Sequence, residues 1–116
     1  MKIPRVYTGP DGKSHFGEID VPDRDMTKYV KECELPIRAG FMRSGSNPGI
    51  EAWHPAPRRQ FVITLKGRME VEAGDGTKKV FGPGDIFLAE DTTGQGHISR
   101  VISKEPRASI FLPLKD

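Results

Sequence analysis

WHPAPRRQFVITLKG, residues 53–67, places a proline-rich turn directly before a run of alternating side chains that ends at a glycine. Alternation with a period of two residues is typical of a half-buried β-strand. One face of this strand carries small or polar side chains: Gln60, Val62 and Thr64. The other face carries bulky ones: Phe61, Ile63 and Leu65. If Gln60 points inward, the face with the small or polar side chains lines a cavity. The face with the bulky side chains then packs outside, against a second layer or a partner subunit.

Short alternating segments of this kind recur along the whole chain. The pattern predicts about ten strands, near residues 3–8, 14–20, 36–43, 50–54, 59–66, 68–73, 77–81, 85–90, 97–103 and 107–112. Turn residues separate them, as in Asn47-Pro48-Gly49 and Gly74-Asp75-Gly76. At most one short helix is expected, over residues 23–33. So many short strands need closure into a barrel or stacking as a jelly roll to protect their edges.

Length and composition limit the classes of protein that fit. The 116 residues suit a single all-β domain spanning 1–116. Lys and Arg are scattered among the acids and the net charge is only +2, so nucleic acid is not an expected partner. No apolar run approaches the roughly 20 residues of a membrane helix. A single cysteine, Cys33, and the absence of an apolar leader predict a soluble cytoplasmic protein. Dimerisation through an edge strand, the N-terminal one, would give a homodimer.

Two histidines and one amide are the residues best placed to form a site. His54 shares a strand face with Ala52 and Ala56, Gln60 opens the next strand, and His97 opens a later one. Since each side chain belongs to the predicted inward face of its strand, we expect His54, Gln60 and His97 to converge on one interior point. The alternative is that both histidines are ordinary core or rim residues.

The spacing of these residues resembles the motifs of the cupin family. The first cupin motif runs from His-x-His through three or four residues to Glu, then through six residues to Gly. His54, Ala56, Gln60 and Gly67 reproduce that spacing. The second motif begins at a glycine, matched by Gly84-Asp85, and its histidine is matched by His97. The resemblance covers residues 49–101 and implies a jelly-roll barrel with one pocket.

The departures from the family pattern concern its metal ligands. A complete cupin site resembles three His and one Glu around Fe, Mn, Zn or Ni. Here Ala56 stands at the second histidine and Gln60 at the glutamate, while Glu90 replaces a proline of the second motif. A neutral amide is a weaker ligand than a carboxylate, so the metal affinity of His54, Gln60 and His97 is expected to be reduced. Glu90, Asp91 or His15 could supply the missing ligand.

Further candidates lie beside the predicted pocket. A carboxylate held in an apolar barrel is suited to move a proton, and we take Glu90 as the candidate general acid or base. Strand parity leaves open whether Glu90 or Asp91 points inward. Arg58 and Arg59, next to Gln60, are candidates to clamp an acidic ligand, although solvated loop arginines are common.

Two functions follow from these expectations. In the first, His54, Gln60 and His97 hold a divalent metal in an enzyme of lyase, isomerase or dioxygenase type, acting on a small polar molecule. In the second, the same residues and Arg58 or Arg59 bind the small molecule without metal or catalysis. The retained histidines favour the enzyme, and the missing ligand at Ala56 favours the binding protein.

Overall fold

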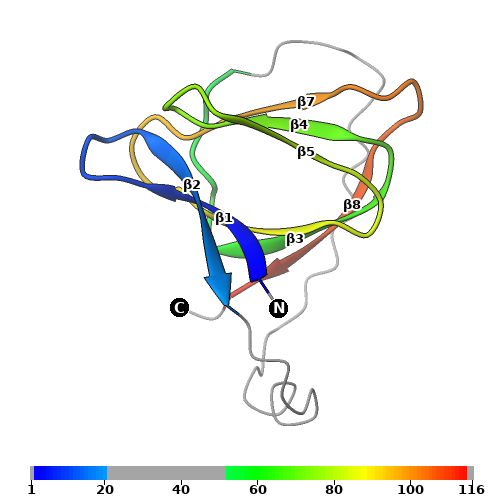
Figure 1. The fold of residues 1–116 in the computed structure, drawn as a ribbon, viewed down its shortest axis with the longest axis horizontal. Coiled ribbons are helices and arrows are strands. Elements are labelled where there is room, and N and C mark those ends of the chain that lie inside the picture. Colours follow the sequence, from blue (N-terminus) through cyan, green and yellow to red (C-terminus); the bar gives the residue numbers. More distant parts are fainter. Residues whose placement is uncertain (1, 21–51, 115–116) are drawn as a thin grey trace, which may run out of the picture.

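The computed structural model describes residues 2–20 and 52–114, which form eight β-strands in two facing sheets. Figure 1 shows the smaller sheet lying across the larger one. The strands are β1 (Lys2–Thr8), β2 (Ser14–Asp20), β3 (Gln60–Lys66), β4 (Met69–Glu72), β5 (Lys78–Phe81), β6 (Ile86–Glu90), β7 (Ile98–Val101) and β8 (Ala108–Pro113). The all-β prediction is confirmed for the described ranges, and these strands agree with the expected ones except at 50–54, whose described residues 52–54 form no strand and make only an isolated bridge at His54. The predicted helix at 23–33 and strand at 36–43 lie outside them.

The larger sheet is mixed and the smaller sheet is antiparallel. The order in the five-stranded sheet is β2-β1-β6-β3-β8, and that in the three-stranded sheet is β5-β4-β7. Within the first, β1 runs parallel to β6, and the other pairs are antiparallel. Since β1 is paired on both sides, the expectation that the N-terminal strand forms the free edge of a dimer is wrong. The sheets are not closed on each other, so a continuous barrel is not formed by these strands.

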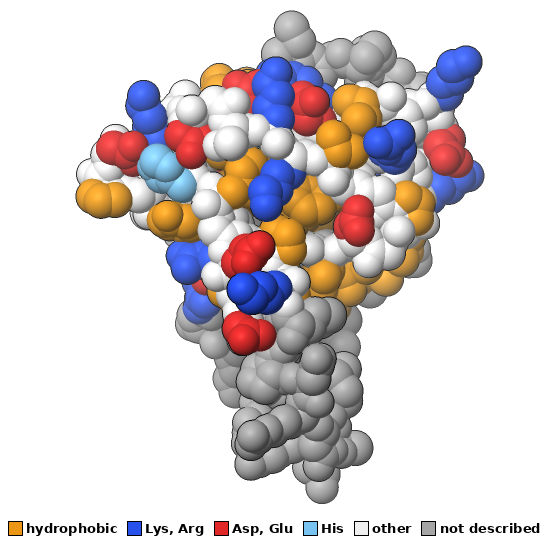
Figure 2. Space-filling view, viewed as in Figure 1, with side chains coloured by type: hydrophobic (Ala, Val, Ile, Leu, Met, Phe, Trp, Pro, Cys, Tyr) orange, Lys and Arg blue, Asp and Glu red, His pale blue; other side chains and the backbone are white. Residues whose placement is uncertain are grey.

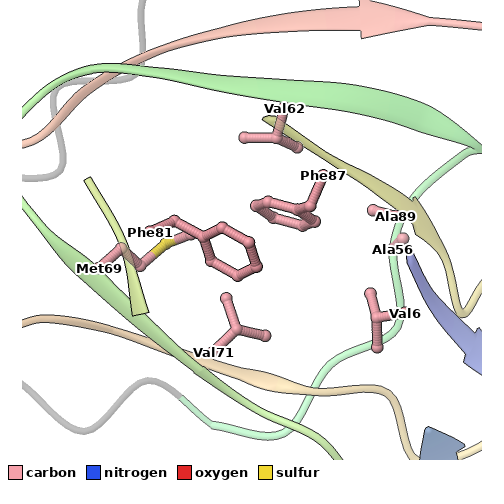
Figure 3. Packing of buried hydrophobic residues seen from close by; sticks show 8 residues of the cluster. All are labelled: Val6, Ala56, Val62, Met69, Val71, Phe81, Phe87 and Ala89. Atoms are coloured by element: carbon pink, nitrogen blue, oxygen red, sulfur yellow. The ribbon is translucent and has the colours of Figure 1, made fainter. Parts of the chain in front are cut away.

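The core fills the space between the two sheets. Met69, Val71 and Phe81 extend from the smaller sheet toward Val62 and Phe87 of the larger one, as Figure 3 shows. The rings of Phe81 and Phe87 stack at 4.5 Å between centroids. Side chains at alternate positions of both sheets therefore meet in the interior, and this alternation decides which side chains can reach a cavity between them.

Two neighbouring residues at the start of β2 join the β1–β2 turn to the β4–β5 turn. The buried Ser14 hydroxyl donates to the Gly96 carbonyl and accepts a bond from the Gly74 amide, both at 2.8 Å. His15 lies between Asp11, at 3.0 Å, and Asp75, at 3.1 Å. The Ser14 hydroxyl, the His15 imidazole and a backbone hydrogen bond from the Asp75 amide to the Ser14 carbonyl, at 3.2 Å, thus join the two sheets at this end.

The surface charges of the described residues are mixed. On the face shown in Figure 2, Lys and Arg side chains alternate with Asp and Glu, with hydrophobic side chains between them. On the outer face of the smaller sheet, Arg100 pairs with Glu72 at 2.9 Å and with Glu70 at 3.3 Å. In the described ranges no helix is long and apolar enough to cross a membrane.

The His15 cluster predicts a pH-dependent contribution to stability. The hydrogen bond to Asp11 raises the pKa of His15 above 6.5, and the same bond lowers the pKa of Asp11 below 3.8. The pKa of Asp75 is also lowered from 3.8, chiefly by its hydrogen bond with the Thr77 hydroxyl. The stabilisation that accompanies the raised pKa of His15 is fully present below pH 6.5. It is lost as the pH rises through the pKa that His15 has in the folded protein. The stabilisation that accompanies the lowered pKa values of Asp11 and Asp75 is present above pH 3.8. It is lost as the pH falls through their pKa values in the folded protein.

The variant His15→Gln should therefore reduce the melting temperature most between pH 3.8 and pH 6.5 and progressively less above that range. Melting curves of the variant and of the parent protein across pH 3 to 9 measure the difference. Lys2→Gln removes an exposed cation that pairs with Glu18 at 3.8 Å, and its effect should be the same at pH 5 and pH 9. A His15→Gln effect of equal size at pH 5 and pH 9 would contradict the assignment.

Candidate functional site

A cavity of about 260 Å³ lies between the two sheets. Its volume is slightly below the usual range for pockets that hold drug-sized molecules, which suits a small metabolite. Apolar side chains form most of the wall, and a few polar side chains interrupt it. The lining residues are His54, Ala56, Pro57, Gln60, Val62, Phe87, Ala89, His97, Ser99, Arg107 and Phe111.

His97 is held in place by a fully buried carboxylate. Its Nδ1 atom lies 2.5 Å from Oδ2 of Asp91, and the His97 and Asp91 residues are only 6% and 0% exposed. Both residues belong to the connection that carries the chain from β6 in the larger sheet to β7 in the smaller one. Because a carboxylate accepts hydrogen bonds, this contact places the imidazole hydrogen on Nδ1. In the neutral imidazole, the Nε2 atom of His97 then has the lone pair.

His54 is joined to His97 through the backbone. The two residues form an antiparallel bridge in which each amide donates to the other's carbonyl, at 3.1 and 3.0 Å. Their rings lie 4.8 Å apart. Gly96 makes this approach feasible, because a Cβ there would lie 2.0 Å from the His54 carbonyl oxygen. The glycine also adopts a φ of +78°, which side-chain-bearing residues rarely take.

Both imidazoles have an oxygen acceptor at Nδ1, although their rings are tilted by 55° relative to each other. Nδ1 of His54 lies 2.9 Å from the carbonyl oxygen of Ala52, which can only accept a hydrogen bond. In the neutral form both rings therefore carry hydrogen on Nδ1 and present Nε2 as an acceptor. Such an arrangement suits either a ligand that donates hydrogen bonds or a metal ion.

Gln60 and the strand it opens follow the sequence prediction. Gln60, Val62 and Thr64 are buried, whereas Phe61 and Ile63 are half-buried and Leu65 is exposed. Gln60 and Val62 line the cavity together with Ala89 and Phe87, their register partners on β6. His54, Gln60 and His97 therefore all line one cavity, but Gln60 and His97 are buried whereas His54 is exposed, so the three do not meet at an interior point as expected. The chemical role of these residues stays a prediction.

Glu90 does not reach this cavity. Its neighbour Ala89 faces the interior, so the next side chain along β6 points to the opposite face of the sheet. There one Glu90 oxygen lies 2.8 Å from Arg5 and the other lies 2.7 Å from Arg59. The assignment of Glu90 as the cavity's general acid or base is wrong for this geometric reason. Asp91 is the carboxylate that contacts the site, through His97.

The predicted arginine clamp is also placed elsewhere. Arg59 is engaged by Glu90, and Arg58 is an exposed residue; both lie outside the set that lines the cavity. His15, considered as a replacement ligand, is bound to Asp11 and Asp75 away from the cavity. None of these three side chains completes the group formed by His54, Gln60 and His97.

Arg107 and Ser99 are cavity residues that the sequence analysis did not identify. Arg107 is 6% exposed and lines the cavity, as does the half-buried Ser99. Parity offers a signal for Arg107, because it shares an alternating face with Ser109 and Phe111. However, the preceding residues Glu105 and Pro106 are typical of a solvated turn, so the local composition predicts that Arg107 is exposed.

The residues around the cavity suit a metal ion only in part. Within the described ranges, no group of three or more His, Cys, Asp or Glu side chains is arranged to hold one. A site here would consist of two imidazole nitrogens and the neutral amide oxygen of Gln60. Metal-binding histidines usually donate the hydrogen on their other ring nitrogen to an oxygen atom, and Nδ1 of both His54 and His97 lies beside such an oxygen. The lack of a carboxylate ligand, however, lowers the expected affinity for a metal ion.

Sequence comparisons match this chain to no known family profile and to no curated protein. One solved structure with similarity is the crystal structure of protein NMB1881 from Neisseria meningitidis. That chain is 13% identical, with a TM-score of 0.48 over 83% of this chain and 100% of the other. The site is therefore interpreted from its own geometry.

The Asp91 contact predicts the tautomer of His97 and a cost for its removal. Asp91→Ala leaves Nδ1 without its acceptor in a buried setting, so we expect a loss of about 1–3 kcal/mol in the free energy of unfolding. Asp91→Asn keeps an oxygen that can accept the bond and should retain more of this stability. Urea unfolding measures both values.

Nitrogen chemical shifts of the neutral imidazole give an independent test. The parent protein and Asp91→Asn should show hydrogen on Nδ1 of His97, and Asp91→Ala should lose this preference. An Nε2–H tautomer of His97 in the parent protein would contradict the proposed orientation.

Proposed function

We propose that this protein binds a small, polar organic molecule in the cavity between its sheets. The observation that carries the proposal is the composition of the cavity wall. Val62, Phe87 and Phe111 provide apolar surface, while His54, Gln60 and His97 provide hydrogen-bonding groups. A mostly apolar pocket with a few convergent polar groups is typical of small-molecule sites.

We further propose that the strands are those of a cupin-like jelly roll. Support comes from the path of the chain, which changes sheets between β3 and β4, β5 and β6, β6 and β7, and β7 and β8. These repeated crossings bring inward-facing residues of both sheets around one cavity. A homodimer remains compatible with this arrangement, with β2 or β8 as the edge strand of the larger sheet.

Binding should perturb the cavity residues selectively. We expect NMR screening of small polar acids, alcohols and amides to shift signals of Gln60 and His97 while leaving those of His15 unchanged. Ser99→Leu inserts a bulkier side chain into the cavity and should weaken binding about tenfold or more, because it removes the space that the ligand needs. Val101→Leu, on the same strand but outside the lining residues, is the matched control.

The outcomes of this screen separate the proposal from nonspecific binding. Hits that spread over the surface and are unaffected by Ser99→Leu would contradict a cavity site. An absence of any cavity shift across a chemically diverse set would do the same. Circular dichroism and melting temperature show whether each variant has kept its fold.

A metal-dependent enzyme is the second candidate, favoured by the orientation of the two imidazoles. His54 and His97 would offer Nε2 and Gln60 its amide oxygen, and a divalent Fe, Mn, Zn or Ni ion would supply Lewis acidity for lyase, isomerase or dioxygenase chemistry. The side chains of this chain would position the substrate against Ser99 and the apolar wall. Asp91 would keep the His97 ring in its orientation.

Elemental analysis of untagged protein decides between the two candidates. The metal-dependent version predicts about one equivalent of a transition metal after incubation with the ion and removal of excess. His97→Gln should lose this metal, while His15→Gln, which changes the histidine outside the cavity, should retain it. Less than about a tenth of an equivalent in the parent protein contradicts the metal candidate and leaves ligand binding as proposed.

A further inference from the structure

Two imidazoles stand side by side in the wall of the cavity. His54 and His97 exchange both backbone hydrogen bonds of an antiparallel bridge, so their side chains lie on the same face of the two chain segments. The ring centroids are 4.8 Å apart, and both residues line the cavity. Neighbouring atoms of one small ligand can therefore contact both rings at once.

Each imidazole offers the cavity one hydrogen-bond acceptor. Nδ1 of His97 contacts Asp91 and Nδ1 of His54 contacts the Ala52 carbonyl, and neither Asp91 nor Ala52 belongs to the lining residues. Nε2 lies across each ring from Nδ1, and within the described ranges no hydrogen bond engages it. Because His97 is only 6% exposed, its Nε2 atom depends on an occupant of the cavity for a hydrogen-bond donor.

Two further lining side chains bring donors close to these acceptors. Gln60 is 8% exposed, and its amide nitrogen carries two hydrogens. Ser99 lies two residues after His97, so its hydroxyl belongs to the same face of the segment as the His97 ring. This part of the wall therefore combines two nitrogen acceptors with an amide and a hydroxyl that donate.

A hydroxyl group is the ligand group that matches this combination. It donates one hydrogen bond and accepts others, so it satisfies an imidazole acceptor and a neighbouring donor at the same time. A carboxylate has no hydrogen to donate to Nε2. An ammonium group has no lone pair for the amide of Gln60, and the described residues of the lining include no Asp or Glu that would balance its charge.

The wall next to this polar part is apolar. Val62 follows Gln60 by two residues, which places it about 7 Å further along β3. Its register partner Phe87 also lines the cavity, and Figure 3 shows the two side chains next to each other. Phe81 stacks against Phe87 and supports it. An apolar ring can pack against this surface while the groups attached to it reach the imidazoles.

We infer that the natural occupant of the cavity has two adjacent hydroxyl groups on a small apolar ring. The inference rests on the proposed binding function and names the ligand class of the same site. One hydroxyl donates to Nε2 of His97 and the other donates to Nε2 of His54. The Gln60 amide and the Ser99 hydroxyl donate to the ligand's oxygen atoms, and the ring occupies the apolar part of the cavity.

Three cyclohexane alcohols test the inference without added metal. The probes are cis-1,2-cyclohexanediol, its isomer trans-1,4-cyclohexanediol with the hydroxyls at opposite ends of the ring, and cyclohexanol with one hydroxyl. Calorimetry or NMR titration gives the dissociation constants. We expect the 1,2-diol to bind about three- to tenfold more tightly than either other probe, the scale of one additional hydrogen bond. It should also shift the Nε2 signals of both His54 and His97.

The variant His54→Phe keeps a ring at this position but removes its acceptor. It should abolish the preference for the 1,2-diol over cyclohexanol. Trp53→Phe is the matched control, because it alters the adjacent aromatic residue, which is outside the lining set, and should keep the preference. If His54→Phe fails to fold, the affinity ratios and the two Nε2 shifts in the parent protein decide by themselves.

The remaining outcomes distinguish this inference from the proposed function. Equal affinities for the three probes, with shifts in the cavity, overturn the diol assignment and leave the binding function intact. Binding that requires a divalent metal overturns direct recognition by the imidazoles. Failure of all three probes to bind overturns the ligand class, and the wider screen of acids, alcohols and amides then decides the binding function separately.

Discussion

The hydrogen bond between His97 and Asp91 controls the geometry of the polar end of the cavity. It lies within the crossing from β6 to β7, so it fixes the connection between the two sheets as well as one imidazole. The backbone bridge to His54 depends on the same crossing, and Gly96 provides the space for it. One buried carboxylate thereby orients one of the two imidazoles that meet there, although it does not itself line the cavity.

Much of this arrangement follows from side-chain alternation in the sequence. The pattern at Gln60, Val62 and Thr64 correctly predicts their burial, and the exposed Leu65 belongs to the predicted outer face. Strand positions are well predicted because short alternating runs between Gly and Pro turns have few other folded solutions. The approach of His54 to His97 was predicted from the same alternation, which places each histidine on the inward face of its predicted strand.

The differences between the predicted site and the structure have two causes. Glu90 and Asp91 are adjacent at the end of a strand, so a shift of one residue exchanges the interior for the exterior. The sequence gives no measure of where the strand ends, and the partners of Glu90, Arg5 and Arg59, come from two other segments. Arg107 was missed because its burial arises from contacts between segments far apart in the sequence, and the close approach of Gly67 to its backbone is one of them. Local composition cannot reveal such contacts.

The parallel pairing of β1 with β6 has a consequence for the order of folding. Arg5 lies opposite Leu88, so the first described strand finds its neighbour in a segment synthesised much later. Pairing across such a long intervening chain is entropically costly and generally slows folding. During synthesis the N-terminal hairpin must wait for most of the chain to emerge before it can dock, and its unpaired edge is a transient risk for association with other nascent chains.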